Sequence, residues 1–126
     1  MGINTNALEN ITATTTETSL VVTPVDKCIV KSFFLINQGG NIVDFRIYGS
    51  PTGIIVGDTL PNSSTPYTQA IIDLHYILVA TVNITANNNH MLDLTDYIFN
   101  FFKLTVQSTT GTSIINYCLQ QAYALV

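Results

Sequence analysis

The feature that most constrains the fold is a series of short segments rich in β-branched and aromatic residues, each bounded by turn-forming residues. Residues 19–23, 26–37, 41–49, 96–108 and 112–126 have the composition of strands. Gly, Pro, Asn and Ser gather between them, for example at 38–41 and 61–66. No segment has a convincing helical period. The sequence therefore predicts an all-β fold, an antiparallel β-sandwich or jelly roll of seven or eight strands.

Residues 67–85 form the longest apolar stretch, and their apolar side chains are too closely spaced for the period to distinguish a strand from a helix. The β-branched content and the closing TVNIT favour a strand. A helix over the first part of the stretch is the alternative. We expect a strand.

Alternation along the strands assigns faces to side chains, because neighbouring residues of a strand point to opposite sides. In 41–48 the predicted core residues are Val43, Phe45 and Ile47. In 97–107 they are Ile98, Phe102, Leu104 and Val106. Phe99 and Phe101 then fall on the face expected to be wet. Two phenylalanines there indicate a contact surface for a partner, unless a loop or the N-terminal segment covers them.

Charge is unusually scarce in this chain, since only 10% of its residues are charged against about 25% in an ordinary soluble domain. A polar surface with so little charge has weak long-range repulsion between copies, which favours self-association. The four basic residues and a net charge of −4 do not form a phosphate-binding stripe. We therefore expect no nucleic-acid partner.

The first 18 residues differ from the rest of the chain, because they are polar, rich in Thr and without a steady period. One interpretation is a frayed terminus. The other is an arm that adds as a strand to an exposed sheet edge of a neighbouring copy. We predict an inter-subunit connector at 1–18 and a β-sandwich domain at 19–126. The candidate contact residues are Ile11, Ala13, Thr15, Leu20, Phe99 and Phe101.

Motifs that carry chemistry are missing from the sequence. It has no Gly-rich phosphate loop, no Gly-x-Ser-x-Gly elbow and no Ser/His/Asp or paired-carboxylate constellation. We expect no enzymatic activity, no cofactor and no bound metal. The first 19 residues lack the basic region and apolar core of a Sec signal peptide, and no apolar stretch is long enough for a membrane span.

The two cysteines, Cys28 and Cys118, are disulfide candidates. Alternation places Cys118 opposite the core face of its strand, whereas Cys28 is in step with Val30, Phe34 and Ile36. Because one thiol is expected inside and the other outside, a bond within one chain requires unusual geometry. A bond between copies and two reduced thiols remain as the alternatives.

The final stretch, SIINYCLQQAYALV, resembles the last strand of bacterial endospore appendage subunits, which bears one cysteine before an aromatic-aliphatic tail. The matching elements are Cys118 and residues 123–126. The stretch VDKCIVKSFFLIN places Cys28 just after the arm, where that family tends to have a cysteine near its first core strand.

This resemblance implies a jelly-roll subunit that polymerises with copies of itself into a helical filament, through N-terminal arms that reach into neighbouring subunits. It implies an extracellular or spore-surface location reached without a Sec signal peptide, and anchor or tip proteins of unknown identity. The family commonly has cysteines in the arm, but residues 1–27 contain none. Longitudinal disulfides are thereby excluded, so strand addition or packing has to hold the stack.

Two alternatives compete with the filament interpretation. Residues 18–48 are similar to small β-sandwich structural proteins of tailed phages, which show a T-x-P…K-x-x-V-x-S…N opening. This similarity implies a capsid decoration, fibre or tail component. A carbohydrate- or surface-binding module is the other alternative, with Tyr48, Tyr67 and Tyr76 as stacking platforms.

Overall fold

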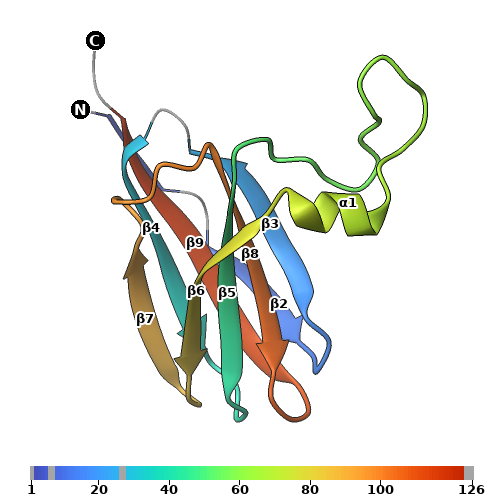
Figure 1. Cartoon of the computed structure of the whole chain (residues 1–126). Coiled ribbons are helices and arrows are strands. Elements are labelled where there is room, and N and C mark those ends of the chain that lie inside the picture. The colour runs from blue at the N-terminus through green and yellow to red at the C-terminus, as the bar shows by residue number, and fades with distance from the viewer. Residues whose placement is uncertain (1, 6–7, 26–27, 124–126) are drawn as a thin grey trace.

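The computed structural model describes residues 2–5, 8–25 and 28–123, which form two antiparallel sheets packed face to face (Figure 1). Sheet A contains β1 (Gly2–Thr5), β2 (Glu9–Ala13), β4 (Cys28–Asn37), β7 (Asn88–Asp93) and β9 (Ser113–Tyr123). Sheet B contains β3 (Thr18–Pro24), β5 (Val43–Ser50), β6 (Ile77–Ile84) and β8 (Phe101–Ser108). A short helix, α1 (Gln69–Leu74), precedes β6 and projects with its preceding loop beyond sheet B (Figure 1).

The strand order is that of a jelly roll, β2-β9-β4-β7 facing β3-β8-β5-β6, with every pairing antiparallel. Both β1 and β2 pair with β9, so they are two pieces of one edge. The nine described strands therefore occupy eight strand positions. The predicted all-β sandwich is confirmed.

The core lies between the two sheets and consists of side chains that alternate inward along the strands. Its fully buried members include Phe33, Leu35, Val43, Phe45, Ile47, Leu94, Phe102, Leu104, Val106 and Ile115. The predicted core faces of 41–48 and of 102–106 are therefore confirmed. Ile98 is the exception, because its side chain is 94% exposed. The strand begins at Phe101, and the residues before it form a loop.

The strand expected over 67–85 is wrong in its first half, where the chain forms α1. Thr68 is the N-cap of this helix, and its side-chain oxygen accepts a hydrogen bond from the Ile71 N–H at 3.4 Å. The helix buries only Ile72. Six residues are too few to show a helical period beside the apolar strand that follows, so composition favoured the strand.

Residues 2–5 and 9–13, which belong to the predicted arm, pair with β9 of their own chain. The structure thus places β2 inside the sandwich, ahead of the predicted boundary at residue 18. Residues 1 and 6–7 of the arm and residues 124–126 of the C-terminal tail lie outside the described residues. Among the described residues, no helix is long and apolar enough to cross a membrane.

Candidate functional site

The N-terminal contact candidates occupy different environments along the edge of the sandwich. Ile11 lies opposite Ile115 on β9 and is 36% exposed, whereas Ala13 is buried in the core of its own chain. Thr15 is exposed, and its carbonyl accepts a hydrogen bond from Gln107 Nε2 at 2.8 Å. Leu20 is half-buried against the core. Of these four residues, Ile11 and Thr15 offer side-chain surface to a neighbour.

Pairing along this edge has a gap. In β9, residues 113–117 pair with β2 and residues 120–123 pair with β1. Cys118 and Leu119 therefore have no N-terminal strand beside them within the described part of the chain. The first four residues of β2 are exposed, so backbone pairing supplies most of the contact that holds this strand.

Phe99 and Phe101 do not form an open aromatic surface, because their own chain covers them. Phe99 lies against Gly49, and its ring contacts that of Phe102 edge to face at 6.3 Å. Phe101 lies against Gly53, a glycine with a φ of +65° in the turn after β5. A turn therefore lies against Phe101, whereas a residue of β5 itself lies against Phe99.

The two cysteines lie at separate points of sheet A. Cys28 pairs with Tyr123 of β9, whereas Cys118 pairs with Phe34 of β4. The five residue positions between Cys118 and Tyr123 span on the order of 17 Å, at about 3.3 Å each. Disulfide-bonded cysteines have Cα atoms about 4.4–6.8 Å apart. The register therefore excludes a bond between these cysteines within one chain.

A bulge accounts for the position of Cys28. The register of β4 against β9 shifts between Cys28 and Val30, so these residues do not share a face as simple alternation predicts. Cys28 packs against the core, whereas Val30 is 37% exposed. Cys118 is half-buried, and this burial raises the pKa of its thiol.

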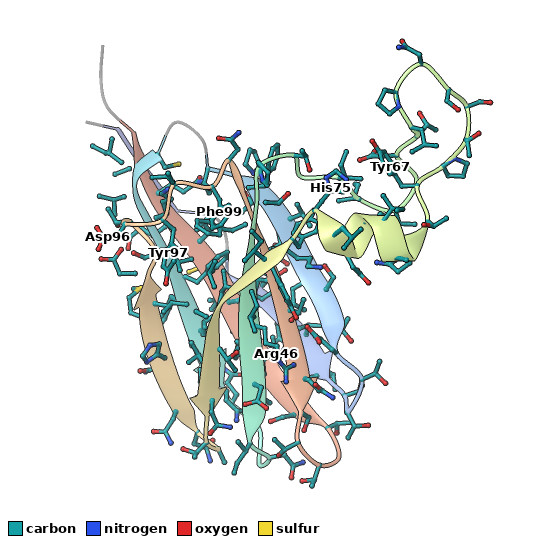
Figure 2. All side chains as sticks on the ribbon, in the orientation of Figure 1. Arg46, Tyr67, His75, Asp96, Tyr97 and Phe99 are labelled. Carbon is teal, nitrogen blue, oxygen red and sulfur yellow. The ribbon has the colours of Figure 1, made fainter. Side chains whose placement is uncertain are left out.

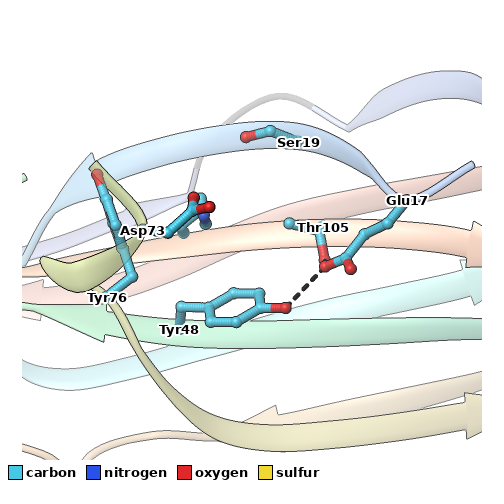
Figure 3. A pocket seen from close by; sticks show the side chains of 7 residues that line it. Glu17, Ser19, Tyr48, Asp73, Tyr76 and Thr105 are labelled. Carbon is cyan, nitrogen blue, oxygen red and sulfur yellow. Dashed lines mark hydrogen bonds between the residues drawn. The ribbon is translucent and has the colours of Figure 1, made fainter. Parts of the chain in front are cut away.

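The outer face of sheet B carries a pocket of about 310 Å³ (Figure 3). Strands β5 and β8 form its floor, β3 and the residue before it form one wall, and α1 with the residue before β6 forms the other. Its lining residues are Glu17, Ser19, Tyr48, Asp73, Tyr76, Lys103 and Thr105.

Glu17 is held in a fixed orientation at one end of this pocket. Its Oε2 accepts hydrogen bonds from the Tyr48 hydroxyl at 2.8 Å and from the Thr105 hydroxyl at 2.7 Å. Its Oε1 lies 3.6 Å from Arg46 Nη1. Burial alone raises the pKa of this carboxyl, but the two hydrogen bonds and the charges of Arg46 and Lys103 outweigh burial and lower it.

Tyr48 is affected in the opposite direction. Burial, followed by its hydrogen bond to the Glu17 carboxylate and the charge of that carboxylate, raises the pKa of Tyr48 to about 12. The neutral phenol is therefore the form that donates to Glu17 throughout the physiological range.

Lys103 lies between two aromatic rings in the same pocket. Its Nζ is 4.6 Å from the centre of the Tyr48 ring and 4.3 Å from that of Tyr76. These are cation–π distances. Within the described residues this ammonium has no hydrogen-bond acceptor and no ion-pair partner. Its three N–H donors therefore remain available to an occupant of the pocket.

Two of the three tyrosines predicted as stacking platforms lie in this pocket, where their rings contact a lysine. Tyr48 and Tyr76 line the pocket, and each has one ring face against Lys103. Tyr67 instead contacts His75 edge to face at 5.7 Å beside α1 (Figure 2). Sequence reasoning missed Glu17, Asp73 and Lys103. Alternation in 97–107 predicts that Lys103 points outward. The sequence pattern does not indicate that Glu17 and α1 lie beside Lys103 on the outer face of sheet B.

Comparisons with known proteins show the fold. No protein-family model and no curated protein matches this sequence. A structure of Bacillus endospore appendages, described as a novel family of disulfide-linked pili, is similar with a TM-score of 0.60 and 12% identity. The match covers 98% of this chain and 89% of that chain. A crystal structure of PirA is similar with a TM-score of 0.56 and 12% identity, over 94% of each chain.

These matches confirm, at the level of the fold, the resemblance to endospore appendage subunits that the cysteine-bearing segments suggested. At 12% identity, the similarity extends to the β-sandwich and its topology.

Proposed function

We propose that this chain is a structural, non-enzymatic subunit of an extracellular filament on a cell or spore surface, and that it polymerises with copies of itself. In this proposal β1 of one copy pairs with β9 of the next copy. The observation that carries it is the divided edge strand, in which β1 and β2 add separately to β9.

Strand pairing between two copies can replace strand pairing within one copy without loss of backbone hydrogen bonds. A β1 segment from a neighbour has the same sequence, so it makes the same backbone hydrogen bonds with β9 as the resident segment does. β2 remains in place during such an exchange, because Ala13 is buried and the Thr14 carbonyl accepts a hydrogen bond from the Ser108 N–H at 2.7 Å. Exchange at β1 therefore leaves the core of each subunit intact.

The surface of the molecule supports close association of copies. Only 10% of the residues are charged, and apolar side chains are exposed on sheet A, including Met91 at 52% and Ile114 at 47%. Phe34 pairs with both Met91 and Cys118 in the register of that sheet, so these residues share one face. Burial of such side chains between subunits favours assembly.

Similarity of fold to the subunits of disulfide-linked pili also supports the proposal. Residues 1–27 of this chain contain no cysteine, so this segment cannot form a disulfide with a neighbouring copy. Backbone pairing through β1 and burial of apolar surface are the forces on which the proposed filament depends.

The test is negative-stain electron microscopy of the purified chain beside variants altered in β1. Deletion of residues 2–8 removes β1 and keeps β2, so the variant is expected to be a folded monomer without filaments. The substitution Ile3→Pro places inside β1 a residue that has no backbone N–H and is poorly accommodated in a paired strand, and Ile3→Val is its matched control. We expect filaments from the full chain and from Ile3→Val, and monomers from Ile3→Pro.

Circular dichroism and thermal melting establish that the variants fold. Filaments formed by the folded deletion variant would contradict exchange through β1. A full-length chain that stays monomeric at high concentration would contradict self-assembly altogether, and would favour the virion alternative, in which a capsid or tail supplies the partner.

A further inference from the structure

The pocket on the outer face of sheet B continues into a second hollow of about 340 Å³. The two share Ser19, Tyr76 and Lys103. The first hollow is polar, with Glu17, Asp73 and Thr105 in its walls. The second is mainly apolar, with Val22, Ile54, Ile55, Val56 and Ile72. Together they form one groove, which we call the sheet B groove, with a polar end and an apolar end.

We propose that the sheet B groove binds a neutral sugar residue. The polar end offers donors and acceptors within one small volume: the Lys103 ammonium and the Ser19 hydroxyl can donate, and the carboxylates of Glu17 and Asp73 can accept. A sugar hydroxyl both donates and accepts, so adjacent hydroxyls satisfy such a mixed set. This binding is separate from β1 and β9 and does not depend on polymerisation.

The charges of the groove argue against charged ligands. An anion that approaches Lys103 also meets Glu17 and Asp73, and a cation that approaches the carboxylates meets Lys103. Arg46 does not change this balance, since it is already engaged by Glu17 at 3.6 Å and by Asp44 at 4.0 Å. A neutral polyhydroxylated molecule avoids both repulsions and still receives charge-assisted hydrogen bonds.

The groups that would contact the sugar are held in place before it binds. Tyr48 and Thr105 fix Glu17 through their hydrogen bonds. The rings of Tyr48 and Tyr76 hold the Lys103 ammonium, and the Tyr76 hydroxyl donates to the Ile54 carbonyl at 2.8 Å. The side-chain amide of Gln69 donates to Asp73 at 2.8 Å. Such preorganisation lowers the entropy that binding costs.

The apolar end of the groove favours a sugar ring over a simple polyol. A pyranose ring has C–H faces as well as hydroxyls, and Ile54, Ile55 and Val56 lie beside the polar end where such a face would rest. Val56 is 75% exposed and Ile55 is 47% exposed. Contact with a sugar ring would remove part of this apolar surface from water.

The experiment is a nuclear magnetic resonance titration of the full chain with methyl glycosides of glucose, galactose and N-acetylglucosamine. Glycoside concentrations on the order of 10 mM detect the weak affinity of a single sugar. Sialic acid and glucosamine serve as anionic and cationic comparators. We expect at least one neutral glycoside to shift the amide signals of residues 19, 73, 103 and 105, with smaller effects from both charged sugars.

Lys103→Met removes the donor but keeps the length of the side chain, and we expect it to weaken binding about tenfold, a loss near 1.4 kcal/mol. Ser19→Ala is a second variant that leaves the tyrosine–lysine contacts intact. Asp96→Asn, in the exposed loop before β8, is the matched control and should bind as the unaltered chain does. The absence of shifts with all neutral glycosides would overturn the proposal, as would equal affinity in Lys103→Met and the control.

Discussion

The Tyr48 hydroxyl donates a hydrogen bond of 2.8 Å to Glu17 Oε2, and through it β5 is tied to the residue that precedes β3. The Thr105 hydroxyl of β8 donates to the same oxygen at 2.7 Å. This arrangement moves the pKa values of the two groups apart, because it lowers the pKa of the Glu17 carboxyl and raises that of the Tyr48 phenol.

Stability is therefore expected to fall at both ends of the pH scale. The pKa of Glu17 is lower in the folded chain than its usual value of 4.5. Its contribution is thus present above pH 4.5 and is lost as the pH falls through the folded pKa. The pKa of Tyr48 rises from 10.0 to about 12 on folding, so its contribution is present below pH 10 and is lost as the pH rises toward 12. The midpoint of urea unfolding, measured from pH 3 to pH 12, should therefore fall at both ends of this range.

Tyr48→Phe separates the two contributions to this pH dependence. The variant has no phenol to ionise, so we expect a smaller loss of stability above pH 10 than in the unaltered chain. It also removes one hydrogen bond from Glu17, so the pKa of that carboxyl rises toward its usual value, and the acid loss should be smaller and complete at a higher pH. An unchanged profile at both ends would contradict the role of this pair.

Gly39 and Gly40 are adjacent in the turn after β4, yet we predict opposite outcomes when each is replaced by alanine. A Cβ at Gly39 would lie 2.7 Å from Ser113 Cα, which is backbone that cannot swing aside. A Cβ at Gly40 meets nothing within 4 Å. Thermal or urea unfolding should show a loss of about 1–3 kcal/mol for Gly39→Ala and little change for Gly40→Ala. Equal effects would contradict this close approach.

Asn37 is fully buried and joins the end of β4 to three other segments. Its Nδ2 donates to the Asn41 carbonyl at 2.7 Å and to the Ile84 carbonyl at 3.0 Å, and its Oδ1 accepts from Ser113 Oγ at 2.7 Å. Asn37→Ala removes these three hydrogen bonds from a buried site, and we expect a loss of at least about 2 kcal/mol in unfolding free energy. Asn89→Ala, on exposed β7, is the control and should be nearly neutral.

The separation of the cysteines predicts which disulfide will not be found. Peptide mapping of the oxidised monomer by mass spectrometry should contain no Cys28–Cys118 cross-link, because the register places the two residues too far apart. Cys118 should also react slowly with Ellman's reagent at neutral pH, since burial raises the pKa of its thiol above the usual 9.0. A cross-linked monomer would show that β4 and β9 pair in another register.

How far the sequence predicts the candidate site depends on the range of the interactions involved. Alternation correctly placed Val43, Phe45 and Ile47 inside, because a strand buried on one face repeats every second residue. Alternation was wrong wherever the strand was interrupted. Ile98 lies in a loop before β8, and a bulge removes Cys28 from the phase of Val30. These interruptions depend on backbone pairing with a partner strand, which the local pattern does not contain.

By itself, the sequence determined the class of fold, through period-two segments bounded by turns, and a surface with little charge. Only the tertiary structure decided that the N-terminal strands pair with β9, that the cysteines are far apart, and that Glu17, Tyr48 and Lys103 share one groove. The physical reason is that the pattern of apolar residues reports which face of a strand is buried. The order of strands in a jelly roll depends on pairings between distant segments, and these pairings set which outward side chains become neighbours.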